Sequence, residues 1–387
     1  MWNLFRKKQQ IGAGKKVFVG VSGGVDSSVS LALLRDAGYD VTGVFIRTWH
    51  PDWLPCDWKE DRRDAMRVCA HVGVPFLELD LEGVYKHDVA DYMISEYRAG
   101  RTPNPDVMCN RYVKFGAFWD WAKSRGADYI ATGHYARIGN ASEWKVESGK
   151  LKVVSEAFAH SLQATHYQLQ TGIDPSKDQS YFLWTLRADE LAHILFPIGH
   201  LPKSEVRKLA EQYGLPTAAK KDSQGICFLG HVDLREFLSR YIETREGDVL
   251  DTSGRIIGNH PGALFFTCGE RHGFTITYKT PNDQPYYVLL KDMDANTIIV
   301  SQEPQREQSA SSFMLDSCVW REFSDTKKYT AHIRYHGIPK PCSIVRNGDT
   351  SATVSFQESD YTVSPGQSIV IYDGDICIGG GIVEKAI

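Results

Sequence analysis

The 387-residue sequence has few cysteines and no long uninterrupted run of apolar residues. Its eight cysteines are scattered, without the density of a disulfide-stapled domain or the CxxC spacing of a metal site. No apolar run approaches the roughly 18 residues that a membrane-spanning helix needs. The first 16 residues are basic but lack the apolar stretch and cleavage site of a secretory signal. We therefore expect a cytoplasmic protein with reduced thiols.

The remaining composition is that of an ordinary globular protein, with 42% apolar residues and a net charge of −4. A chain of this length can hold two or three domains, each with its own core. No internal repeat or low-complexity tract is present.

The first half of the sequence alternates strand and helix patterns. Apolar strands at 17–21, 41–46 and 76–81 are each followed by a helical pattern, and a fourth strand pattern covers 127–135. The second helix is predicted from the spacing of Ala65, Val68, Cys69 and Val72, and the next two helices are expected at 84–98 and 114–125. This alternation predicts an α/β domain with a doubly wound parallel sheet.

The pattern changes twice in the second half. Residues 138–176 read as an inserted β-hairpin or flexible arm, and two further helices are expected at 203–213 and 234–241. From about 246 onward, short strands alternate with turn signals such as DTSGR and YDGD. We predict an α/β domain over 1–245, a small central β-rich domain over 246–305 and a C-terminal β-barrel or sandwich over 306–387.

The stretch VFVGVSGGVDSSVSLALL, residues 17–34, places two glycines between a strand and a helix. It lacks the lysine of a Walker A loop and does not spell the GxGxxG dinucleotide fingerprint. Glycines nevertheless let backbone N–H groups approach an anion, and a helix N-terminus favours negative charge. The hydroxyls of Ser22 and Ser27 can donate to phosphate, while Asp26 can orient the loop or help hold Mg²⁺.

The sequence SGGVDS resembles the pyrophosphate loop (PP-loop) of N-type ATP pyrophosphatases, which transfer AMP to an oxygen. The nucleophile that then attacks, whether ammonia, an amine or sulfur, is not specified by the loop.

Two cysteines lie in contexts that favour reactivity. Cys109 lies in a polar, proline-rich stretch, 100–116, which we expect to be a loop leading into a basic helix. Cys227 follows two lysines and a glycine turn, and nearby cations lower the pKa of a thiol. We expect five other cysteines to be small buried side chains: Cys69, Cys268, Cys318, Cys342 and Cys377.

Several motifs together resemble the tRNA-specific 2-thiouridylases. They are NPDVMCN (104–110), ATGHYAR (131–137), KDQSYFL (177–183), DSQGICFLG (222–230) and the C-terminal PGQ, YDG and GGG segments within 365–382. The resemblance spans the chain from the glycine loop to its end. It implies a PP-loop ATPase domain, a small central domain and a C-terminal β-barrel. It also implies adenylation of O2 of the wobble uridine of tRNA, followed by replacement of that oxygen with sulfur.

The resemblance gives roles to three residues of the reaction. Cys227 would carry a persulfide loaded by a relay protein, and Cys109 would attack it, leaving a transient Cys109–Cys227 disulfide. Sulfur would reach the base directly or as released hydrosulfide. Asp106 would act as general acid or base, although an aspartate after Pro105 is also a common turn residue.

The binding residues also follow from the resemblance. ATP binding is assigned to Gly20, Val21, Ser22, Gly23, Gly24, Val25, Asp26, Ser27, Ile46 and Gly133, with Ile46 expected just after the second strand. Binding of tRNA is assigned to Asn104, Pro105, Asp106, His134, Lys177, Asp178, Gln179, Arg334, Tyr335 and Gln367, with Arg334 and Tyr335 on the barrel. ATP and Mg²⁺ are expected as substrate, with no permanently bound cofactor or metal, and the protein is expected to be a monomer.

An acidic chain is unusual for a tRNA-binding protein, because cations supply most of the affinity. We expect local positive charge around the two cysteines to compensate and to make binding salt-dependent: Lys203, Arg207, Lys208, Lys220 and Lys221 near Cys227, and Arg111 and Lys114 after Cys109.

Two segments depart from the family pattern. The arm between ATGHY and KDQSY is about twenty residues longer than usual in the family, and GERHGFTITYKT (269–280) replaces a GQRxGL-like segment. Two alternatives remain open: another PP-loop enzyme, such as a tRNA lysidine synthetase or an amide-forming ligase, and a non-catalytic tRNA-binding or sulfur-relay protein.

Overall fold

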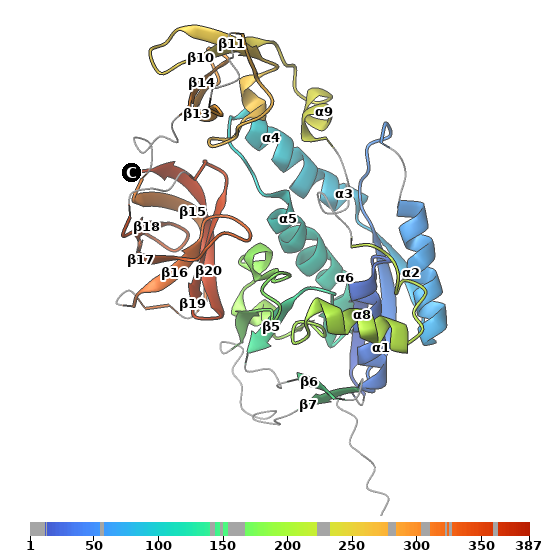
Figure 1. Cartoon of the computed structure of the whole chain (residues 1–387). Coiled ribbons are helices and arrows are strands. Elements are labelled where there is room, and N and C mark those ends of the chain that lie inside the picture. The colour runs from blue at the N-terminus through green and yellow to red at the C-terminus, as the bar shows by residue number, and fades with distance from the viewer. Residues whose placement is uncertain are drawn as a thin grey trace, which may run out of the picture. The chain divides into compact units, whose positions relative to one another are not determined.

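The computed structural model (Figure 1) describes most of the chain as two compact units. Residues outside the description are 1–11, 13, 55–57, 140–143, 148–149, 154–166, 223–232, 278–283, 303–309, 322, 325–326 and 359–362, and 144–147 and 150–153 are described by backbone alone. The first unit comprises 1–86, 107–224 and 375–378, and the second 87–106, 225–374 and 379–387. Among the described residues, no helix combines the length and apolar character needed to cross a membrane.

The first unit contains a five-stranded parallel sheet in the order β3-β2-β1-β4-β9. The strands are β1 (Lys16–Gly20), β2 (Asp40–Arg47), β3 (Phe76–Asp80), β4 (Tyr129–Ala131) and β9 (Ile194–Leu195). The chain adds β2 and β3 on one side of β1 and then β4 and β9 on the other. This order confirms the doubly wound fold, whose ligand crevice lies at the carboxyl ends of strands where the order reverses.

Helices α1 (Val25–Asp36), α2 (Trp58–Val72) and α8 (Lys203–Gln212) build the core of this unit with the sheet. In α2, the four positions that the sequence predicts for the apolar face are buried, whereas the rest of the helix is mainly charged. In α8, Val206, Leu209 and Ala210 are buried as predicted. Helix α1 packs on both α2 and α8, so the start of α8 comes close to the loop before α1.

A helical segment extends further toward the N-terminus than the sequence predicts. It consists of α5 (Pro105–Met108), a π-helical stretch (Cys109–Ala117) and α6 (Phe118–Ser124). The expected start at 114 is therefore wrong, and so is the expected loop around Cys109. Pro105 occupies the first helical position, where its missing N–H costs nothing, and Val107, Met108 and Val113 provide a buried face. A second helical run joins α3 (Glu82–Tyr85), a π stretch (Lys86–Asp91) and α4 (Tyr92–Arg98).

The segment between the first and second halves contains short antiparallel strands. Strands β6 (Trp144–Glu147) and β7 (Lys150–Val153) pair as the predicted inserted hairpin. Strands β5 (Ala136–Gly139) and β8 (Gln168–Thr171) also pair, and Ile376 and Cys377 add to β8. Two short helical turns, Ser180–Leu183 and α7 (Ala188–Leu191), lead back to the sheet.

The second unit holds two β-structures. The central one has the order β12-β11-β10-β14-β13, preceded by α9 (Leu234–Ser239). Its strands are β10 (Gly247–Leu250), β11 (Ile256–His260), β12 (Thr275–Ile276), β13 (Tyr287–Asp292) and β14 (Thr297–Ser301), with a short 3₁₀ turn at Ala263–Phe265. This arrangement agrees with the predicted β-rich central domain.

The C-terminal strands form a closed six-stranded antiparallel barrel, as the resemblance implies. They are β15 (Ser312–Trp320), β16 (Tyr329–His332), β17 (Lys340–Arg346), β18 (Ala352–Phe356), β19 (Ser368–Asp373) and β20 (Ile376–Ala386). Pairing of β15 with both β18 and β20 closes the barrel and removes its free edges.

Candidate active site

The glycine loop after β1 is shaped around two glycines and two serines. Gly23 has φ +77°, and a Cβ there would lie 2.4 Å from the carbonyl oxygen of Asp61, so a larger side chain does not fit. The Ser27 hydroxyl accepts from the Ser22 N–H and donates to the Gly24 carbonyl, each at 3.2 Å. No side chain caps the N-terminus of α1. The loop and the 12-residue helix therefore present backbone donors and a positive dipole end to an anion.

The structure brings the other predicted ATP residues to the carboxyl ends of strands beside this loop. Gly20 ends β1, and Ile46 lies within β2, one residue before its end, rather than after it as predicted. Gly133 follows β4, and a Cβ there would lie 2.7 Å from the Ser27 backbone nitrogen. Only glycine allows β4 to approach the first turn of α1 so closely.

Asp26, in the first turn of α1, is held by two side chains from distant segments. The Lys203 ammonium lies 2.8 Å from both Asp26 carboxylate oxygens, and the Tyr135 hydroxyl donates to one of them at 2.7 Å. Burial and the Asp26 charge raise the pKa of Tyr135, so this hydroxyl stays protonated. The backbone N–H of Lys203 donates to Asp174 at 2.9 Å, which fixes the start of α8.

A second carboxylate, Asp222, binds three cations. Lys203 lies at 2.8 Å, Lys177 at 2.9 Å and Arg207 at 2.6 Å. Burial raises the pKa of Asp222, but hydrogen bonds from Lys203 and Lys177 outweigh it and hold the pKa well below its ordinary value. Lys203 thus bridges Asp26 of the loop and Asp222, and its side chain is only 14% exposed.

The predicted patch of positive charge is balanced by carboxylates. Besides the two α8 cations that bind Asp222, Lys220 lies 2.8 Å from Asp61 and 2.7 Å from Asp64, and Lys208 pairs with Glu205. The pairs of Lys203, Arg207 and Lys220 tie α8, α2 and the loop together. The contribution of these cations, and of Lys221, Arg111 and Lys114, to tRNA binding stays a prediction.

Cys109 lies on the helical segment that begins at Pro105, with Asp106 in its first turn. The Cys109 side chain is fully buried, and the neighbouring Asn110 amide donates to the Phe182 carbonyl at 3.2 Å. The expectation that this stretch is too polar for the core is wrong for Cys109, because Val107, Met108 and Val113 of the same helical segment are buried with it. Widened π-helical turns are frequent at functional sites.

Cys227 lies outside the described residues, which stop at Asp222 and resume at Asp233. The predicted Cys109–Cys227 pair therefore stays a prediction. The other predicted structural cysteines lie inside the described structure: Cys69, Cys318, Cys342 and Cys377 are buried, and Cys268 is half-buried.

His134, predicted to contact tRNA, is almost fully buried and directly follows Gly133. Its ring lies against Phe115 and Phe196, and Nδ1 lies 2.7 Å from the Thr132 hydroxyl. Burial lowers the pKa of His134 well below 6.5, so the ring is neutral at physiological pH.

The KDQ residues of the predicted tRNA set make internal contacts. The Asp178 carboxylate accepts from the Gly172 N–H at 2.8 Å and from the Ser180 hydroxyl at 2.9 Å. Gln179 accepts from the Tyr135 N–H at 3.0 Å, and its own N–H donates to the Tyr135 carbonyl at 2.9 Å. Gln179 therefore holds the segment that carries Tyr135, and the assignment of these three residues to tRNA binding stays a prediction.

Within the second unit, Arg334, Tyr335 and Gln367 of the predicted tRNA set lie outside helices and strands. Arg334 and Tyr335 follow β16, and the Tyr335 ring stacks on His336 with centroids 3.9 Å apart. The Gln367 amide donates to the Thr102 carbonyl at 3.0 Å, which ties it to the segment leading into Asn104 and Pro105.

Sequence reasoning missed the roles of Lys203, Asp222 and Tyr135. One signal was available for Lys203, which is the first residue of α8. A cation at a helix N-terminus opposes the helix dipole, so a lysine there indicates a carboxylate partner.

Three families match successive parts of the chain. The tRNA methyl transferase HUP domain covers 15–231, the tRNA methyl transferase PRC-barrel domain 235–302, and the aminomethyltransferase beta-barrel domain 311–383. The HUP domain match alone covers more than half of the chain.

Similar proteins include the tRNA-specific 2-thiouridylases MnmA of Pseudomonas fluorescens and Chromobacterium violaceum. The first is 40% identical over 96% of this chain and 95% of its own length. The second is 42% identical over 98% of this chain and 94% of its own length. A solved 4-thiouridine synthetase–RNA complex with bound ATP is 19% identical, covers 59% of this chain and 50% of its own, and has a TM-score of 0.33.

Proposed function

The chain belongs to the tRNA-specific 2-thiouridylase family, and we propose that it converts uridine 34 of tRNA to 2-thiouridine with ATP and a cysteine persulfide. The observation that carries this proposal is the phosphate loop with Asp26 and Lys203 at the carboxyl ends of β1 and β4. Full-length relatives at about 40% identity support the same reaction.

ATP would place its triphosphate over the start of α1, where the Gly23–Gly24 backbone and the Ser22 hydroxyl would meet it. The Ser27 hydroxyl donates to the Gly24 carbonyl, so we propose that Ser27 shapes the loop rather than donating to phosphate as predicted. Lys203 supplies a positive charge at the same point, already oriented by Asp26 and Asp222. Ile46, almost buried near the end of β2, would contact the adenine ring.

Mg²⁺ would arrive with ATP as part of the substrate. Among the described residues, no group of three or more histidine, cysteine, aspartate or glutamate side chains could form a metal cage. Mg²⁺ commonly uses one or two carboxylates plus substrate phosphates and water, and Asp26 is a carboxylate of this kind. The residues present therefore fit a metal brought by the nucleotide.

In the first step, uridine O2 would attack the α-phosphorus of ATP as the bond to pyrophosphate breaks. The base loses its N3 proton as O2 becomes the adenylate oxygen, and we assign Asp106 as the acceptor. Preorganised positive charge from α1 and Lys203 would stabilise the pyrophosphate that leaves.

In the second step, the terminal sulfur of a Cys227 persulfide would attack C2 and expel AMP. The Cys109 thiolate then attacks the Sγ of Cys227, which breaks the S–S bond, leaves the sulfur on the base and forms a Cys109–Cys227 disulfide. Attack by Cys109 before the transfer would instead release hydrosulfide, which attacks C2. An external dithiol must reduce the disulfide before the next cycle.

The donor that loads Cys227 would be a persulfide-carrying relay protein. We place the cycle in the cytoplasm, because each turnover ends in a disulfide that a reducing compartment can reopen. We expect the enzyme to act as a monomer.

The test is mass spectrometry of nucleosides from uridine-34 tRNA incubated with the protein, ATP, Mg²⁺ and a persulfide donor. We expect 2-thiouridine from the wild type and at least a hundredfold less from Cys227→Ser and Cys109→Ser. Cys69→Ser serves as the matched control, because Cys69 is a buried residue of the α2 core. Full product formation by Cys227→Ser would overturn the proposal and favour a PP-loop enzyme of another kind.

A further inference from the structure

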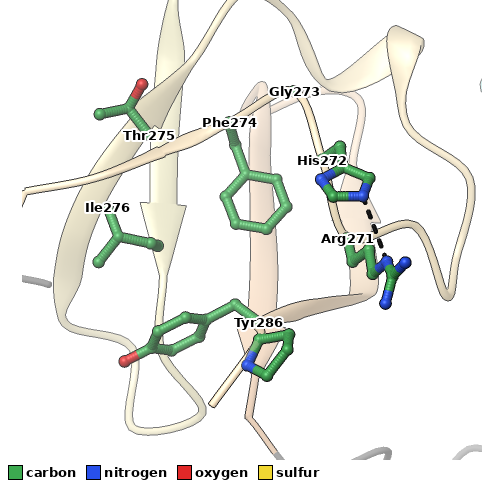
Figure 2. A pocket seen from close by; sticks show the side chains of 8 residues that line it. Arg271, His272, Gly273, Phe274, Thr275, Ile276 and Tyr286 are labelled. Carbon is green, nitrogen blue, oxygen red and sulfur yellow. Dashed lines mark hydrogen bonds between the residues drawn. The ribbon is translucent and has the colours of Figure 1, made fainter. Parts of the chain in front are cut away.

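The central domain contains a pocket of about 510 Å³ that has no part in the mechanism above (Figure 2). It is lined by residues 271–276 with Pro285 and Tyr286, all between or beside strands β11 and β13. None of them belongs to the phosphate loop or to the predicted tRNA-binding set. The volume falls within the range of about 300–1,000 Å³ that is usual for small-ligand sites.

The pocket combines aromatic rings with a cationic edge. Figure 2 shows the Phe274 and Tyr286 rings among its walls, and Arg271 beside His272 at the rim. The Nε–H of Arg271 donates to Nε2 of His272 at 3.2 Å, which orients the guanidinium group. Arg271 and His272 are both exposed, while Phe274 and Tyr286 are half-buried.

Arg235 of α9 holds the loop that forms this pocket through hydrogen bonds to its backbone. Arg235 donates to the carbonyl oxygens of Gly273 at 3.3 Å and His272 at 3.4 Å. Gly273 has φ +97°, and a Cβ there would lie 1.5 Å from the Arg235 guanidinium, so glycine is required. The Phe274 ring packs edge-on against buried Phe266, with centroids 5.9 Å apart. These contacts fix the backbone of the loop and the Phe274 side chain that line the pocket.

Among the described residues of this loop, the carboxylate next to Arg271 in the sequence, that of Glu270, is already paired. Glu270 lies 3.4 Å from Arg235, which neutralises it. Arg271 thus adds its charge to a pocket that is also lined by the Phe274 and Tyr286 rings. A planar ring that stacks on Phe274 or Tyr286 and an anion that meets Arg271 are the two parts of a nucleotide.

From this geometry we infer that the central-domain pocket binds one unstacked nucleotide of the tRNA, with its base on the aromatic wall and its phosphate at Arg271. This inference rests on the proposed function for the identity of the RNA. Unpaired nucleotides suit such a pocket, because their bases can leave the stack and lie on aromatic side chains. The contact would add affinity and orientation without touching the reacting base.

The test is the dissociation constant of tRNA, measured without ATP over a series of salt concentrations. Arg271→Gln is expected to weaken binding about five- to tenfold and to reduce the slope of log K against log salt by about one. Tyr286→Leu is expected to weaken binding about tenfold with the slope unchanged, and Tyr286→Phe to restore most of it. Arg255→Gln is the matched control, because Arg255 lies in the same domain, outside the pocket, and its side chain is 80% exposed.

The outcomes separate this inference from the proposed function. If the wild type binds tRNA and the dissociation constants of Arg271→Gln and Tyr286→Leu equal that of Arg255→Gln, the inference about the pocket is overturned and the proposed function is not. A wild type that fails to bind tRNA would overturn both. AMP binding, measured by calorimetry, identifies the alternative. If Arg271→Gln weakened AMP binding while its tRNA affinity stayed unchanged, the pocket would be a free-nucleotide site and the tRNA assignment would be overturned. Equal urea midpoints for all variants would show that the differences do not come from misfolding.

Discussion

The Nζ atom of Lys203 lies 2.8 Å from both carboxylate oxygens of Asp26, although the two residues are 177 positions apart. This contact links the first turn of α8 to the first turn of α1. An incoming triphosphate would compete with Asp26 for the same ammonium group. Lys203 is therefore a positioning residue for phosphate in the proposed reaction, and Asp222 holds it in place from the other side.

Replacing Lys203 with glutamine is expected to reduce tRNA-dependent pyrophosphate release about a hundredfold, the size of effect seen when one preorganised hydrogen-bond donor is removed. Lys208→Gln is the matched control, because Lys208 lies on the same helix with its side chain 63% exposed. Pyrophosphate release is measured with a coupled phosphate assay. A Lys203→Gln rate within twofold of the control would exclude a role for Lys203 in nucleotide use.

Substitution of Gly133 by alanine is expected to weaken ATP binding at least tenfold. The added Cβ would meet the Ser27 backbone nitrogen at 2.7 Å, so the loop must shift away from its phosphate-binding shape. Gly83→Ala is the control, because a Cβ at Gly83 meets nothing within 4 Å. Titration calorimetry measures both affinities, and an unaltered Gly133→Ala dissociation constant would contradict this account of the loop.

The buried His134 predicts a dependence of stability on pH. Burial lowers the folded-state pKa of His134 well below 6.5, whereas the unfolded chain binds a proton near that pH. The unfolded state therefore holds more protons as the pH falls, and this stabilising contribution, complete above pH 6.5, is lost on acidification. One such group gives a slope of up to about 1.4 kcal/mol per pH unit below its unfolded pKa.

Urea unfolding between pH 8 and pH 5 measures this slope for wild type and His134→Gln. We expect His134→Gln to be less stable at pH 8 but to lose less stability on acidification. His87→Gln controls for removal of a histidine whose side chain is 85% exposed. Equal slopes for wild type and His134→Gln would show that the His134 ring does not resist protonation.

Replacing Cys109 with serine is expected to separate the two chemical steps. Pyrophosphate release dependent on tRNA should persist in the first turnover, because the phosphate loop is unchanged, while 2-thiouridine falls at least a hundredfold. Both products can be measured in one quenched reaction. Parallel loss of pyrophosphate and 2-thiouridine would show that Cys109 is required for the nucleotide step or for folding of its buried helix.

The sequence was sufficient to predict the doubly wound sheet, the α2 and α8 faces and the inserted hairpin. Each depends on local periodicity, since the apolar positions of α2 recur at helical spacing whatever they pack against. The glycine loop was also predictable, because positive φ at Gly23 and the close approach at Gly133 both demand glycine.

The long-range pairs were not predictable in the same way. Lys203, Arg207 and Lys220 look like a cationic surface until the fold brings Asp26, Asp61 and Asp222 to them. The helix around Cys109 was missed because its polar residues and prolines favour a loop locally, whereas packing of Val107 and Val113 stabilises a helix. In both cases tertiary contacts outweigh local signals.

The fate of one oxygen atom tests the central claim most directly. A tRNA that carries ¹⁸O at O2 of uridine 34 would be thiolated by the enzyme in unlabelled water, and the AMP product analysed by mass spectrometry. Adenylation of O2 followed by sulfur attack at C2 predicts that the label leaves on AMP, which becomes two mass units heavier. Unlabelled AMP formed together with 2-thiouridine would contradict the account, because the oxygen would then have left the base without ever being bonded to phosphorus.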